Sequence, residues 1–408
     1  MPGESWFLSY ALLGLAQSGL APILLPLASH GAARAGLTYA AFALTGLVAP
    51  VMGSWGDRTG RHRDLLIGGC AMAAACFAAY TVAPPEFRIL LAAGAGLGTM
   101  AATTAGNVLA IQDQPEETWD DRVGTLQRFI STGQVIGLVL AGLLASRHLP
   151  AGFICAGVAL GLGAALGAVA APGRQKRAAH DKPAPRPAVG GEAGFRGSHR
   201  HHRLNASQLL GHLRTVDPGI RHLLVIWLLA YTLMNGVAVL FPVVMVTHYG
   251  MRPIAPSAAY AAGVTLSLLV YHPASMLAHK RGGGTVLMAG FAARLVLYIV
   301  MTGLGLLHAS WAGMLVLIAF ALTQVVWPPL SVGANVLTLR IQPSARGENV
   351  GLFNAATSLA SAVGSALGGA IFGLLGFAVL AGIASFCIAG ALALSAVWLR
   401  PAQKSKSA

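Results

Sequence analysis

The sequence contains 408 residues, of which 55% are hydrophobic and only 10% are charged. Soluble proteins average about 25% charged residues, so the composition excludes a soluble protein and indicates one that lies in a membrane. The formal net charge of +14 would suit a nucleic-acid-binding protein, but the basic residues are confined to short segments between apolar runs. That distribution is typical of loops beside anionic lipid, and we expect no nucleic-acid partner.

Twelve apolar runs are long enough to cross a bilayer, which takes about 20 residues. They form two groups of six on either side of a long polar segment. We therefore predict an all-α membrane protein with twelve transmembrane helices in two six-helix pseudo-repeats. The predicted spans are 6–29, 37–55, 64–83, 87–111, 123–146, 151–171, 222–247, 254–279, 285–307, 311–339, 348–373 and 377–399.

The same runs divide the chain into four parts. We predict an N-terminal six-helix bundle over 1–171, a basic, histidine-rich cytoplasmic linker over 172–221, a C-terminal six-helix bundle over 222–400 and a cytoplasmic tail over 401–408. The linker has the polar, proline-rich composition of chain that does not form a core. Its histidines lack the spaced acids or cysteines typical of a metal site, so we expect it to contact lipid headgroups.

Lysine and arginine gather in alternate connections between the predicted spans. One set of connections carries nearly all of them, and the opposite set holds little more than Arg34, Arg88, Arg147 and Arg252. Because basic residues collect on the cytoplasmic side, both termini are predicted to be cytoplasmic. We expect a multi-pass protein of the bacterial cytoplasmic (inner) membrane that works as a monomer.

An internal repeat relates the two halves. Parts of the fourth and fifth predicted spans recur in the tenth and eleventh, at offsets of 228 (335 − 107) and 227 (364 − 137). Such symmetry is common in transporters. The matching pieces are Asn107-Val108-Leu109 with Asn335-Val336-Leu337, Gln114-Pro115 with Gln342-Pro343, and Gly137 and Gly142 with Gly364 and Gly369.

Residues 53–63, between the second and third predicted spans, form the densest charge cluster in the first hundred residues. We predict a tight basic loop there, because backbone in a bilayer turns only where water reaches it. The pattern resembles the loop signature G-x-L-a-D-r-x-G-r-k-x-x-l of the major facilitator superfamily, with Trp55 and His62 in place of its leucine and lysine. The matching residues are Gly53, Asp57, Arg58, Gly60, Arg61 and Leu65.

The resemblance implies a transporter in which Asp57 docks against neighbouring helices when the cytoplasmic side is closed. Arg122 and Arg128, at the start of the fifth span, are its expected partners. Asp57 and Asp113, at cytoplasmic helix ends, are candidates for protonation, as is His272. None of the 13 acidic residues falls in the middle of a span, which argues against an exporter dedicated to organic cations and against simple carboxylate-driven antiport.

The fifth predicted span contains four glycines with the spacing G-x8-G-x3-G-x4-G: Gly124, Gly133, Gly137 and Gly142. This spacing is similar to a signature of drug/proton antiporters in the same superfamily, although Leu138 stands where that signature has proline. The resemblance favours export. The alternative is a stripe of small residues that lets helices pack closely.

Polar and aromatic side chains occur near the middle of several spans. Buried amides without partners are unfavourable, so they should face a cavity or each other, and amides among aromatic rings are typical of a small-molecule pocket. Each amide alone also fits a hydrogen bond between packed helices. The predicted substrate-binding residues are Gln17, Asn107, Gln134, Tyr231, Asn235, Tyr271, His272, Gln324 and Trp327.

Two further features of the C-terminal half bear on the pathway. Trp327-Pro328-Pro329 is predicted to interrupt the tenth span, and broken helices mark the pathway region of transporters. Arg294 lies near the middle of the ninth span, where a charged side chain points to function. Because that span is peripheral in the family, snorkelling or capping of a neighbouring helix fits Arg294 as well as a substrate contact does.

We predict a secondary active transporter that moves a small organic solute by rocker-switch alternating access, exporting it in exchange for protons. The alternative is an importer or facilitator of sugars or related polar solutes. An enzyme is not expected, since the spans contain no nucleophile elbow, HExxH, phosphate loop or carboxylate pair. The expected partners are the small-molecule substrate and membrane lipid, with no cofactor and no metal.

Overall fold

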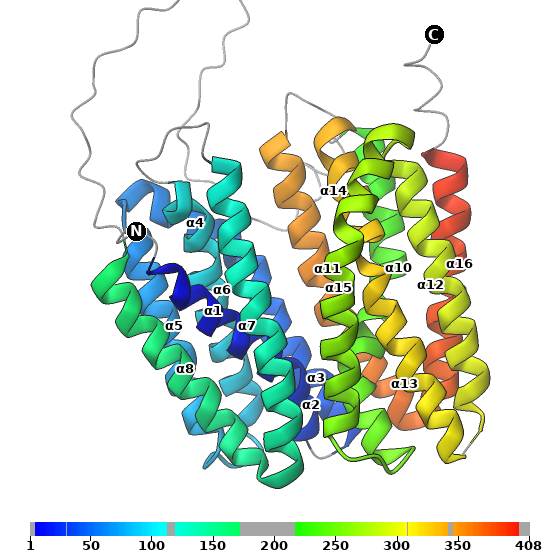
Figure 1. Cartoon of the computed structure of the whole chain (residues 1–408), viewed down its shortest axis with the longest axis horizontal. Helices are drawn as coiled ribbons and strands as arrows, with labels where there is room; N and C mark the ends of the chain where they lie inside the picture. Colours follow the sequence, from blue (N-terminus) through cyan, green and yellow to red (C-terminus); the bar gives the residue numbers. More distant parts are fainter. Residues whose placement is uncertain are drawn as a thin grey trace, which may run out of the picture.

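The computed structural model of the protein describes residues 5–29, 31–111, 119–171, 217–307, 309–341 and 346–399 (Figure 1). Regular structure in these ranges is helical throughout. Among the described residues, 11 helices are long and apolar enough to cross a membrane, and a shorter apolar helix covers Ala32–Val48. The prediction of an all-α, multi-pass membrane protein is confirmed.

The N-terminal helices follow the order of the predicted spans closely. The first span is built from α1, a π-helical segment η1 and α2, and the second from α3, a 3₁₀ segment η2 and α4. The bounds are α1 (Phe7–Gly14), η1 (Leu15–Leu20), α2 (Ala21–Leu27), α3 (Ala32–Leu44), η2 (Thr45–Val48), α4 (Ala49–Thr59), α5 (His62–Tyr80), α6 (Arg88–Ile111), α7 (Trp119–Arg147) and α8 (Leu149–Ala170).

The C-terminal helices repeat the arrangement on the other side of the undescribed segment. One span is again built from two helices, α13 and α14. The bounds are α10 (Pro218–Thr247), α11 (Ile254–Arg281), α12 (Gly283–Gly305), α13 (Ser310–Val325), α14 (Trp327–Ile341), α15 (Arg346–Leu375) and α16 (Phe377–Trp398).

The second span differs from its prediction. Instead of one helix over 37–55, it runs from Ala32 to Thr59 and changes to 3₁₀ geometry over Thr45–Val48. The cause is local, because α4 begins with a proline in its first turn, and proline cannot donate the hydrogen bond that would continue an α-helix.

The tight basic loop predicted over 53–63 is also corrected. Most of this stretch is helical, since α4 continues through Thr59 and α5 begins at His62. The chain reverses at Gly60, which has a φ of 63° and forms the left-handed C-cap of α4. Glycine suits that position because it has no Cβ to clash with the backbone.

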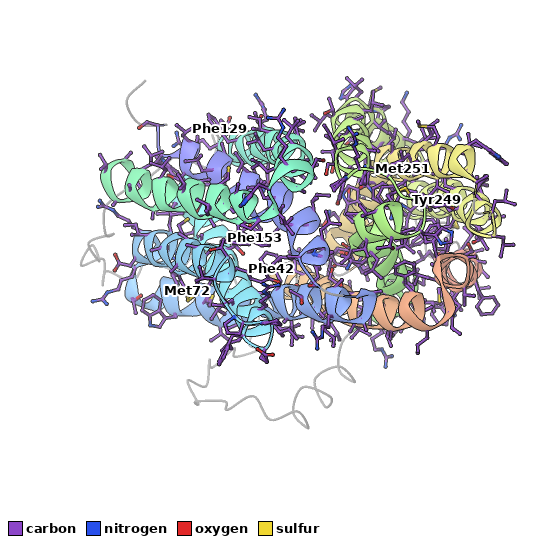
Figure 2. The ribbon with its side chains drawn as sticks, turned by 90° about the horizontal axis from the view of Figure 1, so that it is seen from below. Phe42, Met72, Phe129, Phe153, Tyr249 and Met251 are labelled. Carbon is purple, nitrogen blue, oxygen red and sulfur yellow. The ribbon has the colours of Figure 1, made fainter. Side chains whose placement is uncertain are left out.

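The buried apolar side chains form two clusters, one drawn almost entirely from 6–171 and the other almost entirely from 220–399. Seen from below, the helices accordingly lie in two groups, with Phe129 and Phe153 in one and Tyr249 and Met251 in the other (Figure 2). Each half therefore has its own core. The exact boundaries 1–171, 172–221, 222–400 and 401–408 stay predictions, and most of the linker lies outside the described residues.

The two halves meet through glycines and small residues. A Cβ at Gly36 of α3 would overlap the Ser365 carbonyl of α15, and a Cβ at Gly142 of α7 would lie 2.7 Å from the Ser257 Cβ of α11. Both contacts lie at the end of the molecule away from Ala170 and Pro218, the helix ends that flank the linker (Figure 1). Glycine thus lets the backbones of the two halves approach closely at the end remote from the linker.

Candidate functional site

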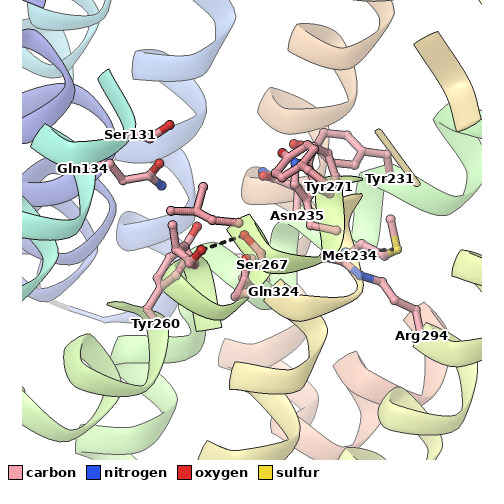
Figure 3. A pocket seen from close by; sticks show the side chains of 14 residues that line it. Ser131, Gln134, Tyr231, Met234, Asn235, Tyr260, Ser267, Tyr271, Arg294 and Gln324 are labelled. Carbon is pink, nitrogen blue, oxygen red and sulfur yellow. Dashed lines mark hydrogen bonds between the residues drawn. The ribbon is translucent and has the colours of Figure 1, made fainter. Parts of the chain in front are cut away.

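A cavity of about 230 Å³ lies between the two halves (Figure 3). Two of its lining residues come from α7, and the others come from α10, α11, α12, α13 and α14. The lining residues are Ser131, Gln134, Tyr231, Met234, Asn235, Ala238, Tyr260, Val264, Ser267, Leu268, Tyr271, Arg294, Gln324 and Trp327.

The cavity lies near the middle of the predicted membrane thickness. Gln134 is eight positions before Gly142 on α7, which at 1.5 Å per residue places it about 12 Å from the contact that joins the halves. Asn235 and Arg294 likewise lie near the centres of α10 and α12. The cavity is therefore separated from one end of the molecule by the packed contact between α7 and α11.

Six of the nine predicted substrate-binding residues line this one cavity. They come from helices that are far apart in the sequence. The property that they share in the sequence is a predicted position near the middle of the membrane. These six are Gln134, Tyr231, Asn235, Tyr271, Gln324 and Trp327.

The tenth span is broken between two residues that line the cavity, Gln324 and Trp327. α13 ends at Val325 and α14 begins at Trp327, as predicted from the Trp327-Pro328-Pro329 sequence. The two prolines have no N–H to donate to the preceding turn. The amide of Gln324 and the indole of Trp327 thus line the cavity from the two sides of the break.

The other three predicted residues are not lining residues. Gln17 lies on the π-helical segment η1, where its Oε1 accepts a hydrogen bond from the Thr103 hydroxyl at 3.0 Å. His272 is exposed, and the side chain of Asn107 lies outside the described part of the chain. Their roles in binding stay predictions, and Gln17 has the helix-packing contact that was its alternative.

Two amides of the cavity are held by hydrogen bonds, Asn235 by the neighbouring helix α15 and Gln324 by the preceding residue of α13. Asn235 Nδ2 donates to the Ser361 carbonyl and to Ser365 Oγ, both at 3.1 Å. Gln324 Nε2 donates to Thr323 Oγ1 at 3.2 Å. These bonds fix the orientation of the amides, and none of them uses the side-chain oxygen of Asn235 or Gln324, so both oxygens can accept a hydrogen bond from a solute.

Aromatic rings form one wall of the cavity. Tyr231 stacks on Trp227, with ring centroids 5.2 Å apart and an interplanar angle of 13°. The Trp327 ring lies 5.8 Å from Tyr231, and Tyr260 meets Phe320 edge to face at 5.4 Å. Packed rings of this kind offer a rigid surface for a flat, apolar part of a solute.

Arg294 reaches the same cavity from α12 (Figure 3). Its side chain is only 5% exposed. Nη2 donates to the Thr323 carbonyl at 2.8 Å, Nη1 contacts Met234 Sδ at 3.5 Å, and the guanidinium carbon lies 5.6 Å from the Trp327 ring centre. Arg294 therefore caps the last turn of α13, which was one of its predicted alternatives, and it also lines the cavity; a contact with the substrate stays a prediction.

Several lining residues were missed by the sequence reasoning. Ser131, Met234, Ala238 and Tyr260 are examples, and none of them stands out by residue type. A helical period contains the signal, because residues three, four and seven positions apart share a face. Moving back along α11 from the predicted Tyr271 by such intervals reaches the other lining residues of that helix, namely Leu268, Ser267, Val264 and Tyr260.

The glycines of α7 have two kinds of contact. Gly133 and Gly137 pack against the first span, where a Cβ at Gly137 would lie 2.9 Å from the Gly19 Cα and one at Gly133 would overlap the Ala11 carbonyl. Gly142 instead packs across the boundary between the halves. The surroundings of the fourth predicted glycine, Gly124, lie outside the description.

The structure describes the arginines of the predicted gate, Arg122 and Arg128, but not the side chain of Asp57. The side chains of Asp57 and Arg58 and the whole of Asp113 lie outside the description. Arg122 Nε donates to the Ala110 carbonyl at 2.8 Å, and its guanidinium carbon lies 5.5 Å from the Phe7 ring centre. Arg128 is exposed. Pairing of either arginine with Asp57 stays a prediction.

In the rest of the charge cluster Arg61 is exposed, whereas His62 is buried. Arg61 and Asp64 form an exposed ion pair with Nε and Oδ2 3.8 Å apart. Gly53 allows an ordinary contact, since a Cβ there would lie 3.4 Å from Thr104. Over the described ranges, no group of three or more histidines, cysteines or acids could hold a metal ion.

Comparison with known proteins identifies the family of the chain. The model of the Major Facilitator Superfamily matches residues 6–332. No curated protein sequence gives a match.

Three solved structures share the fold. The nucleoside transporter NupG is 14% identical, with a TM-score of 0.67 over 97% of this chain and 98% of that one. A bacterial homologue of the iron transporter ferroportin in an inward-facing state is 14% identical, with a TM-score of 0.70 over 96% of each chain. A bacterial homologue of the human lysosomal transporter Spinster, inward-facing and unoccupied, is 14% identical, with a TM-score of 0.64 over 98% and 94%.

Proposed function

The chain belongs to the Major Facilitator Superfamily, and from that membership we propose that it is a secondary transporter that carries a small organic solute through the cavity between its halves. The family is one of transporters, so the protein is a transporter and not an enzyme. The proposed mechanism is rocker-switch alternating access, in which the two halves tilt about a central site.

The observation that carries the proposal is the position of the cavity. Side chains of α7 face side chains of five helices of the other half across it. The contacts of Gly36 with Ser365 and of Gly142 with Ser257 would close one end of the pathway. If these contacts separate while contacts near the linker form, the same cavity opens to the opposite side of the membrane.

Export coupled to protons is the proposed direction. Its support is the spacing of Gly133, Gly137 and Gly142, which is similar to the antiporter signature. Since Gly133 and Gly137 serve close packing against the first span, the argument for direction depends on the sequence alone. We also propose that the protein lies in the bacterial cytoplasmic membrane with both termini in the cytoplasm.

Import or facilitated passage of a polar solute is the second candidate. The cavity offers the amide oxygens of Asn235 and Gln324 beside the rings of Tyr231 and Trp327, and amides and rings together suit hydroxyl-bearing solutes. One structure with the same fold is that of a nucleoside transporter. Direction separates the two candidates, because loss of an exporter raises sensitivity to a compound and loss of an importer removes use of one.

The test combines a ligand screen with flux. Thermal shift of the purified protein across sugars, amino acids, organic acids and drugs identifies a solute, which is then followed in right-side-out and inverted vesicles with an imposed pH gradient. We expect uphill movement that reverses with the gradient. Solute movement that ignores the gradient in both orientations would exclude proton-coupled export.

A matched pair of variants ties flux to the cavity. Ala238→Trp fills the cavity, whereas Ala293→Trp adds the same ring at an exposed position of α12. We expect flux to be lost in Ala238→Trp and kept in Ala293→Trp. Equal flux in the two variants would remove the cavity from the transport pathway.

A further inference from the structure

Arg294 is a buried cation without a counter-ion in the described part of the protein. Arg61 and Asp64 pair with each other at the surface, and no acidic residue is among the described residues that line the cavity. The titratable groups that interact with Arg294 are phenols: Tyr231 of α10, Tyr260 of α11 and Tyr298 of α12 itself. A charged side chain in the middle of a membrane is costly and is normally paired, so a missing partner is expected.

The unused donors of Arg294 identify the chemistry of that partner. A guanidinium has five N–H donors in a planar fork, and the protein engages one through the Thr323 carbonyl and one through Met234 Sδ. Arg294 Nε is buried and has no hydrogen-bond partner among the residues that the structure describes. The remaining donors include Nε, and a guanidinium that offers two N–H groups of its planar fork binds a carboxylate through two parallel hydrogen bonds.

The surroundings of Arg294 describe the rest of the ligand. Trp327 and Tyr231 both line the cavity, with ring centres 5.8 Å apart, and aromatic lining suits a flat ring attached to the acid group. The volume of about 230 Å³ lies below the range of about 300–1,000 Å³ that is usual for drug-sized ligands. The ligand should therefore be small, with one acidic group.

We propose that the transported solute is a small organic carboxylate with a flat ring, whose carboxylate is bound by Arg294 while Trp327 and Tyr231 contact the ring. This inference depends on the proposed function, because it names the class of solute for the same cavity. It assigns to Arg294 a direct contact with the solute, and it explains why a peripheral span carries a buried arginine.

The test uses pairs of probes that differ in charge but hardly in shape. Benzoate with benzamide, nicotinate with nicotinamide, and indole-3-acetate with indole-3-acetamide are added to the purified full-length protein in a buffer without carboxylates or phosphate. We expect at least one carboxylate to raise Tm more than its amide does. If no carboxylate exceeds its amide, the proposal is wrong.

Variants of Arg294 test whether this side chain binds the carboxylate of the probe. In Arg294→Gln we expect the carboxylate to bind about 10- to 100-fold more weakly, as for a lost hydrogen bond to a charged group, and its amide to bind as before. Arg294→Lys keeps the charge without the fork and should bind with intermediate affinity, which also covers the case in which Arg294→Gln does not fold. Arg252→Gln, at an exposed position, is the control. An unchanged preference for the carboxylate in Arg294→Gln and Arg294→Lys would overturn the assignment.

A third variant separates this proposal from the proposed function. Ala238→Trp fills the cavity and should abolish binding of every probe. If carboxylate and amide bind the wild type equally and both are lost in Ala238→Trp, the cavity is the solute site but the preference for an anion is wrong. If probes bind equally to Ala238→Trp and wild type, the cavity itself is not the site.

Discussion

The N-terminal and C-terminal halves pack their helices in the same way but contribute differently to the cavity. In the N-terminal half, Gly137 of α7 packs against Gly19 of the first span. In the C-terminal half, Gly364 of α15 packs against Gly236 of α10. Gly137 and Gly364 are equivalent in the internal repeat, so the repeated sequence specifies a repeated contact between helices.

The side chains around the cavity do not follow that symmetry. The N-terminal half supplies Ser131 and Gln134, whereas the C-terminal half supplies the aromatic wall, two more amides and Arg294. Glycine packing thus builds both halves alike, and we expect the C-terminal half to contribute most of the contacts with the solute. Substitutions in the two halves test this division between packing and binding.

Replacing a glycine inside either half should have the largest effect. A Cβ at Gly133 would overlap the Ala11 carbonyl, and one at Gly364 would overlap the Thr232 carbonyl. Because backbone atoms cannot rotate away, Gly133→Leu and Gly364→Leu should each cost about 3 kcal/mol or more of stability and remove most folded protein in gel filtration. Gly161→Leu is the control, since nothing lies within 4 Å of a Cβ there. Equal yields for the three variants would contradict the shared packing.

Gly142 should respond differently from Gly133 although both lie on α7. A Cβ at Gly142 would lie 2.7 Å from the Ser257 Cβ, so Gly142→Leu should oppose contact between the halves and leave each half folded. An overpacking cost of about 1–3 kcal/mol shifts a two-state ratio by about 5–150-fold. The measurement is labelling of a single cysteine at Ala32 by an impermeant maleimide. Faster labelling with normal yield is expected; normal labelling with poor yield would show that Gly142 serves folding instead.

The amides of the cavity should show the asymmetry between the halves. Asn235→Ala removes an amide that α15 holds in place through Ser361 and Ser365, and it should weaken solute binding by about tenfold, as for the loss of about 1.4 kcal/mol. Gln134→Ala, on the N-terminal side, should weaken binding by about three- to fivefold, since a typical neutral hydrogen bond contributes about 1 kcal/mol. Isothermal titration with the solute from the ligand screen gives both values. A larger loss for Gln134→Ala would reverse the asymmetry.

Gln17→Ala should have the smallest effect on binding. Its Oε1 accepts from Thr103 between the first span and α6, so the variant should lose about 1 kcal/mol of stability and less than about twofold in affinity. The comparison with Asn235→Ala uses the same titration. A tenfold loss of affinity in Gln17→Ala would return this residue to the binding site, as its depth in the membrane had predicted.

The sequence predicted how deep polar residues lie in the membrane better than it predicted which way their side chains point. Gln134, Asn235 and Gln324 were selected because amides near the middle of a span need a partner, and all three line the cavity. Gln17 met the same criterion and lies on a helix contact, because depth does not determine which way a helix is rotated. That rotation is decided by close contacts such as Gly137 with Gly19.

Two local features of the second span could not be predicted from the composition of the sequence. A proline in the first turn of α4 and a 3₁₀ segment over Thr45–Val48 move the second span and shorten the predicted loop to a turn at Gly60. Arg294 was placed on a peripheral span, but its long side chain reaches between helices to Thr323 and Trp327. The position of a span in the fold therefore predicts the contacts of a long side chain less well than those of a short one.

A reversible cross-link between the halves tests most directly whether transport requires them to separate and rejoin around the cavity. A Cβ at Gly373 of α15 would lie 3.7 Å from the Ala32 Cβ of α3, close to the mean of about 3.8 Å between the Cβ atoms of a disulfide. Cysteines are placed at Ala32 and Gly373 in a chain whose Cys70, Cys76, Cys155 and Cys387 are replaced by alanine. We predict that oxidation stops solute flux in proteoliposomes and that reduction restores it. Undiminished flux in the fully cross-linked protein would contradict alternating access.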